Sequence, residues 1–290
     1  MSRAKFNCYN YLMIKLGAHL SISGGYHKAL ERIVKIGGNC LQIFSTSPRG
    51  WSFVKISGQQ IQDFNSIKSQ LKIDPVYFHA SYLINLANEG KIGHLSKLSL
   101  ISELSIAPKL HIKGSIVHLG SYVGEKTAEK YKALIIHVKD ILDKTPKESL
   151  LIIENAGNSK IGKNLKEIAK IIQDVGNPRL RVCLDTCHLY SAGYDLSSQI
   201  KLETFLKEFD LLIGLEKIEL FHFNDSRDPL NSGRDRHENI GKGTIPTEEF
   251  KSIMTHPQLK HLPFIIETPG FDDEGPDKKN LDVLKSLILL

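Results

Sequence analysis

Short apolar runs alternate with longer segments of helical periodicity along this chain, and this alternation constrains its fold more than any other feature. The runs predict eight strands, over residues 14–18, 40–44, 75–79, 115–119, 150–154, 181–185, 218–223 and 264–267. The segments between them predict helices over 26–36, 58–71, 128–142, 165–175, 202–214 and 247–255, and Pro276 is placed to open a last helix. Repeated strand–helix units of this kind predict an α/β protein, a (β/α)8 TIM barrel.

No glycine–serine linker or block of charge divides the 290 residues, so a single barrel domain over residues 13–290 is predicted. Residues 1–12 are expected to form a short, mobile N-terminal extension, with a transit peptide as the alternative. A doubly wound open sheet would give a similar alternation. However, no GxGxxG motif follows the first strand, as a dinucleotide-binding sheet of that kind would require.

Composition restricts the compartment and the partners. The net charge of +6, from 38 Lys+Arg and 32 Asp+Glu, permits nucleic-acid binding without requiring it. The four cysteines form no CxxC pair, which is typical of a reduced, intracellular protein. No apolar stretch approaches the roughly 18 residues that cross a bilayer, and the N-terminus lacks the apolar core of a secretory signal. The chain is therefore expected to be neither secreted nor bound to a membrane.

Potential metal ligands stand at or near the ends of six successive predicted strands. They are His79, His118, Glu154, Asp185, His222 and Glu267. Because the carboxyl ends of barrel strands converge on one rim, we expect these side chains to meet there. Nitrogen and oxygen donors together suit zinc or manganese better than calcium or magnesium. The sequence therefore predicts a metal site at the carboxyl ends of the strands.

A second set of ligands lies close behind the first. In the stretch VCLDTCHLY, His188 follows Asp185 by three residues and is expected to reach outward to a different ion. Asp235 and His237 stand two apart in the loop after the seventh strand, so an extended backbone would point both to one face. The alternative is that this loop is a solvated run of charge. His19, His27, His94, His111, His137, His256 and His261 are interpreted as structural or solvated, and His19, which follows the first strand, is the least clear of them.

Seven motifs together carry a family resemblance that extends from about Leu16 to the last strand. They are GAHLSISGG, HASYLINLA, IENAGN, CLDTCHLYSAGYD, HFNDS, GRDRHENIGKG and IIETPG. In this combination the chain resembles the endonuclease IV family of apurinic/apyrimidinic (AP) endonucleases, which act in DNA base excision repair. The resemblance implies a barrel with three zinc ions, with manganese as an alternative at one position.

The resemblance also implies how the ligands are shared. His79, His118 and Glu154 would hold one zinc, and Glu154 would bridge to a second. Asp185, His222 and Glu267 would complete the second site, while His188, Asp235 and His237 would hold the third. Glu154 and Glu267 would be the catalytic carboxylates, beside a metal-bound hydroxide as nucleophile.

The implied reaction is hydrolysis of the phosphodiester on the 5′ side of an abasic site in double-stranded DNA. It would leave a 3′-hydroxyl and a 5′-deoxyribose phosphate, and the same site would clean blocked 3′ ends. A monomer is expected, acting in the cytoplasm or wherever the DNA is. With three zincs, four carboxylates and a bridging hydroxide the site would carry about +1, whereas the metal-free rim should repel phosphate.

DNA contacts are predicted from two parts of the sequence. By resemblance, Arg49 and Tyr82 stand in loops that insert into DNA at the lesion, and Gly50 replaces the larger polar residue of many relatives. From the loop after the seventh strand, Arg227, Arg234 and Arg236 are candidates for phosphate contacts.

Two other functions remain open at this level. A divalent-metal sugar isomerase would use a similar barrel with acids and histidines at strand ends, but it gives no role to Asp235 and His237 beside His188. A catalytically silent protein that binds abasic DNA is the other alternative, and the intact ligand set argues against it.

Overall fold

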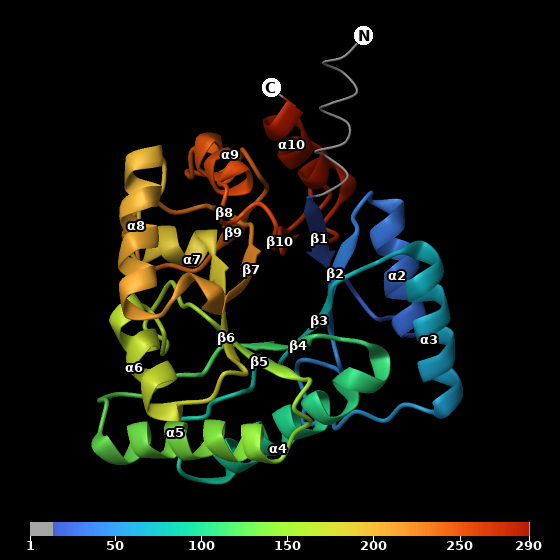
Figure 1. The fold of residues 1–290 in the computed structure, drawn as a ribbon, viewed down its shortest axis with the longest axis vertical. Helices are drawn as coiled ribbons and strands as arrows, with labels where there is room; N and C mark the ends of the chain where they lie inside the picture. The colour runs from blue at the N-terminus through green and yellow to red at the C-terminus, as the bar shows by residue number, and fades with distance from the viewer. Residues whose placement is uncertain (1–13, 290) are drawn as a thin grey trace.

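The computed structural model describes residues 14–289, so the predictions for residues 1–12 and for Cys8 lie outside it. Eight parallel strands form a closed barrel in the order β1-β10-β7-β6-β5-β4-β3-β2 (Figure 1). The barrel strands are β1 (Lys15–His19), β2 (Cys40–Phe44), β3 (Val76–His79), β4 (Gly114–Val117), β5 (Leu150–Glu154), β6 (Leu180–Asp185), β7 (Ile218–His222) and β10 (Pro263–Ile266). The predicted TIM barrel is confirmed.

Helices surround the barrel and cover its outer face (Figure 1). They are α2 (Tyr26–Lys35), α3 (Gly58–Leu71), α4 (Lys91–Ile106), α5 (Ala128–Asp143), α6 (Leu165–Val175), α7 (Thr186–Ser191), α8 (Gln199–Leu212), α9 (Thr247–Thr255) and α10 (Lys278–Leu289). Short 3₁₀ turns occupy Ala107–Leu110 and Leu215–Lys217, and β8 (Asp225–Ser226) pairs with β9 (His237–Glu238) outside the barrel. Within residues 14–289 no helix combines the length and apolarity needed to span a membrane.

The main differences from the sequence-based expectation concern α4, α7 and α8, and the short α7 is not among the predicted helices. The sequence does not predict α4, because much of its buried face consists of Gly93, Ser96, Ser99 and Glu103 rather than an apolar stripe. Helix α8 begins at Gln199 instead of residue 202 because the Ser198 hydroxyl accepts a hydrogen bond from the backbone N–H of Lys201 and caps it.

The barrel interior is filled by one apolar side chain from each of seven strands. These are Cys40, Tyr77, Ile116, Ile152, Cys183, Leu220 and Ile265. Side chains in a strand alternate between faces, so the residue two positions after each of these also points inward, one level nearer the carboxyl rim. The fold therefore places a second interior layer directly above the apolar one, and its members are Gln42, His79, His118, Glu154, Asp185, His222 and Glu267.

Glu103 on α4 is a buried carboxylate whose oxygens accept hydrogen bonds from Ser45 Oγ at 2.8 Å and Ser115 Oγ at 2.7 Å. Burial raises its pKa from 4.5 to about 7, although both hydroxyl donors favour ionisation. Because the pKa of Glu103 is higher in the folded protein than in the unfolded one, its protonated form stabilises the fold. This contribution to the free energy of unfolding is complete below pH 4.5 and is lost as pH rises through about 7.

Replacing Glu103 with glutamine is expected to remove this pH dependence. Between pH 5 and pH 8, the free energy of unfolding of Glu103→Gln should rise relative to that of the wild type, by up to roughly 3 kcal/mol. Urea denaturation of both proteins across this range measures the difference. A constant difference at all pH values would contradict the assignment of the titration to Glu103.

Candidate metal centre at the barrel mouth

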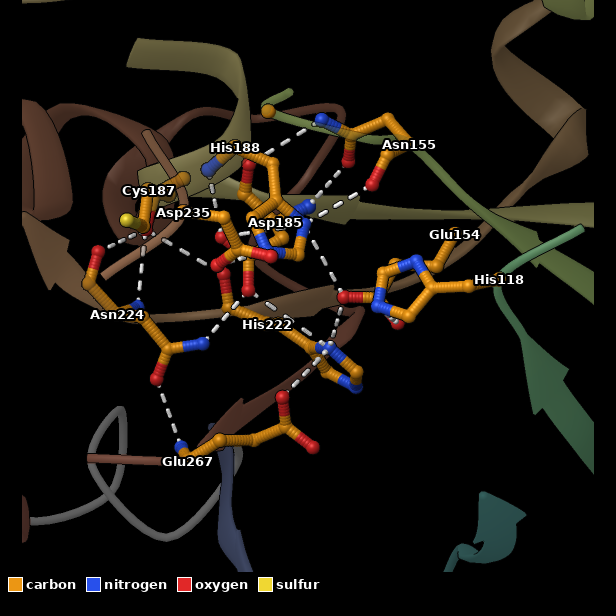
Figure 2. A network of polar contacts seen from close by, with 12 residues as sticks. His118, Glu154, Asn155, Asp185, Cys187, His188, His222, Asn224, Asp235 and Glu267 are labelled. Atoms are coloured by element: carbon orange, nitrogen blue, oxygen red, sulfur yellow. Dashed lines mark hydrogen bonds and ion pairs between the residues drawn. The ribbon is translucent and has the colours of Figure 1, made fainter. Parts of the chain in front are cut away.

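All nine sequence-predicted ligands lie together at the carboxyl mouth of the barrel, and Figure 2 shows seven of them converging. Beside them a cavity of about 820 Å³ opens, lined by residues that include His79, His118 and Glu267. Glu154 lies beneath the cavity and is completely buried. The side chains divide into three groups of potential ligands, which share members.

The first group consists of His79, His118 and Glu154. The Nε2 atoms of the two imidazoles lie 3.2 and 3.3 Å from the same oxygen, Oε2 of Glu154. The three residues come from adjacent strands: His79 ends β3, His118 lies just beyond the end of β4, and Glu154 ends β5. The arrangement leaves two nitrogens and one oxygen facing each other within reach of one cation.

The second group gathers around Nδ1 of His222. This atom lies 3.1 Å from Oε1 of Glu154, 3.4 Å from Oε2 of Glu267 and 3.9 Å from Oδ2 of Asp185. Glu154 therefore directs one oxygen to each of the first two groups. A carboxylate placed in this way can bridge two cations.

The third group contains His188, Asp235 and His237. Oδ1 of Asp235 lies 2.9 Å from Nε2 of His188 and 3.5 Å from Nε2 of His237. Asp185 joins this group to the second, because its Oδ2 also lies 3.7 Å from Nε2 of His237. Asp235 and His237 thus face the same side of the loop, as their spacing of two predicts.

The short helix α7 explains why the apolar strand β6 ends in an acid. Oδ1 of Asp185 accepts the backbone N–H of His188 at 2.9 Å, which caps the first turn of the helix. That turn brings the His188 side chain back over the rim. Asp185 thus has a structural task at the helix start, and its Oδ2 still faces the neighbouring imidazoles.

The loop that carries Asp235 and His237 is fastened rather than solvated. Asp225, which is buried, accepts backbone N–H groups from Gly241, Gly243 and Ile245 at 2.9 to 3.0 Å. These bonds hold the loop between β7 and α9 against the barrel. The loop is thus anchored at its far end, while its charged residues Arg227, Arg234 and Arg236 stay exposed.

Four of the five clustered histidines place their outward ring nitrogen against a carbonyl oxygen. The acceptors are the backbone of Ala80 for His79, Asn155 for His188 and Glu267 for His237, and the side chain of Gln42 for His222, at 2.7 to 3.3 Å. A nitrogen in that position carries a proton, so the other nitrogen, which faces the carboxylates, is the one that can bind a cation once its own proton has left. Metal-binding histidines are commonly fixed in this way.

Charge in the cluster is set by the competition between burial and neighbours. Burial opposes ionisation of Glu154 and Glu267, but the facing imidazoles hold the pKa of both carboxyls well below the usual range. Burial raises the pKa of Asp185 despite His188 nearby. Burial also lowers the pKa of His118 to about 4, which leaves that imidazole neutral at physiological pH. Ionised carboxylates and a neutral imidazole are the forms that bind a cation.

Three imidazoles behave differently from His118. Burial lowers the pKa of His79, His188 and His222, but their neighbours outweigh it and raise the pKa of each. For His79 and His188 these neighbours are the facing carboxylates, whereas for His222 the buried Cys183 contributes first and the carboxylates of Glu267 and Glu154 follow. A cation bound among them must therefore displace protons, so metal affinity should fall as pH falls. The donor set fits divalent ions for a further reason, since Nδ1 of His118 is buried without a hydrogen-bond partner among residues 14–289.

Sequence reasoning missed several residues of the cluster. His19 is the last residue of β1, and its Nδ1 lies 2.9 Å from Oε1 of Glu267. Cys187 offers Sγ within 4.8 Å of the ligand atoms of Asp235 and His237. Two amides hold Asp185 (Figure 2): Nδ2 of Asn224 donates to its carboxylate at 2.6 Å, and Oδ1 of Asn155 accepts its backbone N–H at 2.6 Å.

Gln42 is the missed residue with the clearest task. Its amide is fully buried, its Oε1 accepts from Nε2 of His222 at 2.7 Å, and its Nε2 donates to Oε1 of Glu267 at 2.5 Å. The signal for it was present in the sequence, because it is the one polar residue inside an apolar strand and stands two positions after the inward-facing Cys40.

Removal of the Gln42 amide is expected to loosen His222 and Glu267. We expect Gln42→Leu to lower zinc affinity by about 10- to 100-fold, the usual cost of losing an outer partner of a metal ligand. Gln42→Glu keeps the acceptor for His222 but opposes Glu267, so it should recover only part of the affinity. Competition with a zinc-chelating dye measures both, and unchanged affinity in Gln42→Leu would disprove this role.

The structure places Arg49 and Tyr82 on neighbouring loops at the mouth. Ser81 Oγ donates to the Pro48 carbonyl at 2.7 Å and ties the two loops together. Tyr82 is 67% exposed and lies edge-on to Phe44, with ring centroids 5.3 Å apart. A Cβ built at Gly50 would meet no atom within 4 Å, so the larger side chain of relatives would fit there.

The three arginines of the loop after β7 do not line the cavity, and each is engaged in an ion pair. Arg227 Nε lies 3.2 Å from Glu238, while Arg236 Nε donates to Asp228 at 2.7 Å and Arg234 lies 3.5 Å from the same carboxylate. All three side chains nevertheless remain exposed.

Comparison with known proteins gives three findings. A family model described as the xylose isomerase-like TIM barrel matches residues 30–287. A protein of Halothermothrix orenii named probable endonuclease 4 is 36% identical over 276 residues, which cover 94% of this chain and 99% of the relative. The crystal structure of endonuclease IV from Thermus thermophilus matches with a TM-score of 0.83 at 32% identity, covering 94% of this chain and 98% of that one.

Sugar epimerases share the architecture. The structure of a D-tagatose 3-epimerase-like protein matches with a TM-score of 0.72 at 17% identity, covering 95% of this chain and 97% of that one. At that identity the likeness concerns the barrel alone.

Proposed function

This chain belongs to the endonuclease IV family of xylose isomerase-like TIM barrels, and from that membership we propose that it cleaves DNA at abasic sites with divalent metal ions at the barrel mouth. The chain is a hydrolase that acts on phosphodiester bonds. The observation that carries the proposal is the set of nine facing ligands, in which the histidines direct one ring nitrogen toward shared carboxylates and the other to a carbonyl oxygen.

Three zinc ions per chain, with manganese as an alternative at one position, are the metals we propose. His79, His118 and Glu154 would hold the first, and Glu154 would bridge to the second. The second would also take Asp185, His222 and Glu267, and the third would take His188, Asp235 and His237. Mixed imidazole and carboxylate donors support zinc over magnesium.

Bound there, divalent ions would supply Lewis acidity toward the phosphoryl oxygens and the departing 3′ oxygen. Glu154 is fully buried between two ligand groups, so its task is to hold their spacing. The Glu267 side chain is 16% exposed and lines the cavity, where it can accept a proton from an attacking water. The water oxygen bonds to phosphorus on the 5′ side of the lesion, the bond from phosphorus to the 3′ oxygen breaks, and the departing 3′ oxygen takes up a proton, which Glu267 can return. The products are a 3′-hydroxyl and a 5′-deoxyribose phosphate.

Recognition of the lesion would use the loops around the cavity. Arg49 and Tyr82 are exposed, adjacent and close to the ligands, which suits insertion into the base stack at the lesion. Arg227, Arg234 and Arg236 would contact phosphates with the exposed sides of their guanidiniums. An abasic nucleotide lacks pairing and stacking, so extruding it costs less than flipping an intact one, and this difference favours abasic DNA.

The wider proposal concerns how the enzyme works in repair. We expect a monomer with one barrel domain, acting on double-stranded DNA inside the cell. The open cavity would also admit a blocked 3′ end, so the same ligands would clean such ends.

A nicking assay tests the proposal directly. A duplex with one tetrahydrofuran residue, labelled at its 5′ end, should be cut on the 5′ side of the lesion by zinc-loaded protein, and a polymerase should extend the product. The same duplex without the lesion should stay intact. No cleavage by protein that contains zinc would refute the nuclease function, and tight binding without cleavage would indicate a silent damage-binding protein.

The sugar isomerase alternative is tested with the same preparation. Metal analysis should give about three zincs per chain, and a ketohexose incubated with manganese-loaded protein should remain unchanged. Turnover of the sugar, with one or two magnesium or manganese ions bound, would favour the isomerase.

A further inference from the structure

Lys160 is the single lysine or arginine among the described residues that line the large cavity. It lies in the loop between β5 and α6, and it lines the cavity together with His118 and His188. The four carboxylates of the cluster belong to the same mouth. If the chain is a nuclease, a backbone phosphate must enter this cavity, and the Lys160 ammonium is a positive side chain in its lining that could bind the phosphate.

The backbone around Lys160 is fixed. Ala156 N–H donates to the Gly162 carbonyl at 3.0 Å and closes the loop, and Ile161 N–H donates to the Gly120 carbonyl at 2.9 Å. Ile161 itself is 1% exposed and packs in the core beside β4 and β5. The Asn158 side chain accepts the N–H of Lys160 at 3.0 Å. These contacts determine where the lysine side chain starts.

The ammonium group, in contrast, is uncommitted. Within residues 14–289 no carboxylate, carbonyl or hydroxyl accepts a hydrogen bond from Nζ of Lys160. Some nearby lysines are paired, as Lys170 is with Asp174 at 2.9 Å and Lys126 with Glu167 at 3.1 Å, and what distinguishes Lys160 from the other uncommitted lysines is its place in the cavity lining. Lys160 is also near enough to the cluster to act on it. The pKa of His118 is lowered first by burial and then by positive neighbours that include Lys160.

We propose that the Lys160 ammonium binds a non-bridging oxygen of a backbone phosphate of the lesion strand, on the His118 side of the cavity. The contact orients the strand without taking part in bond breaking. It rests on the proposed nuclease function, and it assigns a substrate contact to a residue outside the nine ligands. A phosphate oxygen supplies the acceptor that Nζ lacks. Because the loop backbone is already fixed, little conformational freedom is lost on binding.

The test measures how DNA binding depends on salt, because each lysine–phosphate contact adds a fixed amount to that dependence. The probe is a duplex already nicked on the 5′ side of a tetrahydrofuran residue, so that binding is measured without cleavage. In Lys160→Met, the affinity of zinc-loaded protein should fall about tenfold or more. The slope of log affinity against log salt should decrease by about 0.9, the value for one lost phosphate contact.

Three comparisons isolate the effect. Lys160→Arg should restore the slope, since it keeps the charge. Lys170→Met removes a lysine from the helix that follows the same loop and should leave slope and affinity unchanged. Zinc content and melting temperature should be the same in all variants, because Lys160 is not proposed as a ligand.

Two results would overturn the assignment: a wild-type salt slope in Lys160→Met, or a loss of zinc in that variant that accounts for its weaker binding. Either outcome is distinct from failure of the proposed function. That failure would appear as the absence of nicking by the wild-type protein, whereas the Lys160 assignment is judged on equilibrium binding alone.

Discussion

Replacement of Glu154 with glutamine is expected to abolish nicking of abasic DNA, with a loss on the order of 10⁴-fold. Oε2 of Glu154 faces His79 and His118, and its Oε1 faces His222 at 3.1 Å and His188 at 3.3 Å. Glutamine keeps one oxygen and replaces the other with an amide that donates hydrogen bonds and cannot bind a cation. One substitution therefore removes the shared ligand of two groups.

The Glu154 variant should also lose metal, and this separates it from a general defect. Metal analysis is expected to show about one zinc remaining, in the group of His188, Asp235 and His237. The matched control is Glu219→Gln, which changes a barrel glutamate that accepts a hydrogen bond from the Tyr77 hydroxyl at 2.8 Å and lies outside the cluster. Full zinc content and normal nicking in Glu154→Gln would remove Glu154 from the proposed metal centre.

Much of the site follows from the two-residue period of a strand applied to a closed barrel. Ile152 and Glu154 lie on one face of β5, as Leu220 and His222 do on β7, so an inward apolar residue predicts the direction of the polar one two positions later. The sequence could therefore predict the barrel and the convergence of the ligands. The same rule, applied to Cys40, would also have found Gln42.

His19 and Gln42 could not be assigned to the cluster from the sequence because their residue types alone do not indicate which side chains they meet. His19 stands alone in its motif, and its partner Glu267 lies 248 residues away. Gln42 is not titratable, so a search for ligands passes over it. Both residues reach their partners only because the eight strands close into a barrel, which brings the ends of the first and last strands together.

Long-range pairing limits what could be predicted for the loops. The role of Asp225 depends on three N–H groups that lie 16 to 20 residues further on, and nothing local in the sequence indicates those bonds. Arg236 looked free in sequence because its partner, Asp228, stands eight positions before it and meets it only through the fold of the loop. Charge patterns alone therefore could not distinguish paired arginines from the uncommitted Lys160.

Removal of metal is expected to eliminate nicking and also to weaken binding of abasic DNA, by at least about tenfold. Without cations the four carboxylates of the mouth carry up to about −4, and protonation of His79, His188 and His222 offsets part of this charge but adds none of the excess that bound cations supply where a phosphate would sit. With three divalent ions the same site becomes net positive. Anisotropy titration of a fluorescent duplex, nicked on the 5′ side of a tetrahydrofuran residue, measures affinity before and after treatment with a chelator.

The electrostatic origin of this effect can be separated from unfolding and from loss of general DNA affinity. Near-UV circular dichroism should show that the metal-free protein keeps its tertiary packing. Added zinc should restore both binding and nicking, whereas magnesium should restore neither, because imidazole nitrogens make poor magnesium ligands. Affinity for an undamaged duplex should fall less, since by the proposal the exposed arginines would contact it away from the ligands. If metal-free and zinc-loaded protein bound the nicked abasic duplex equally well, cations at the mouth would have no part in holding the phosphate.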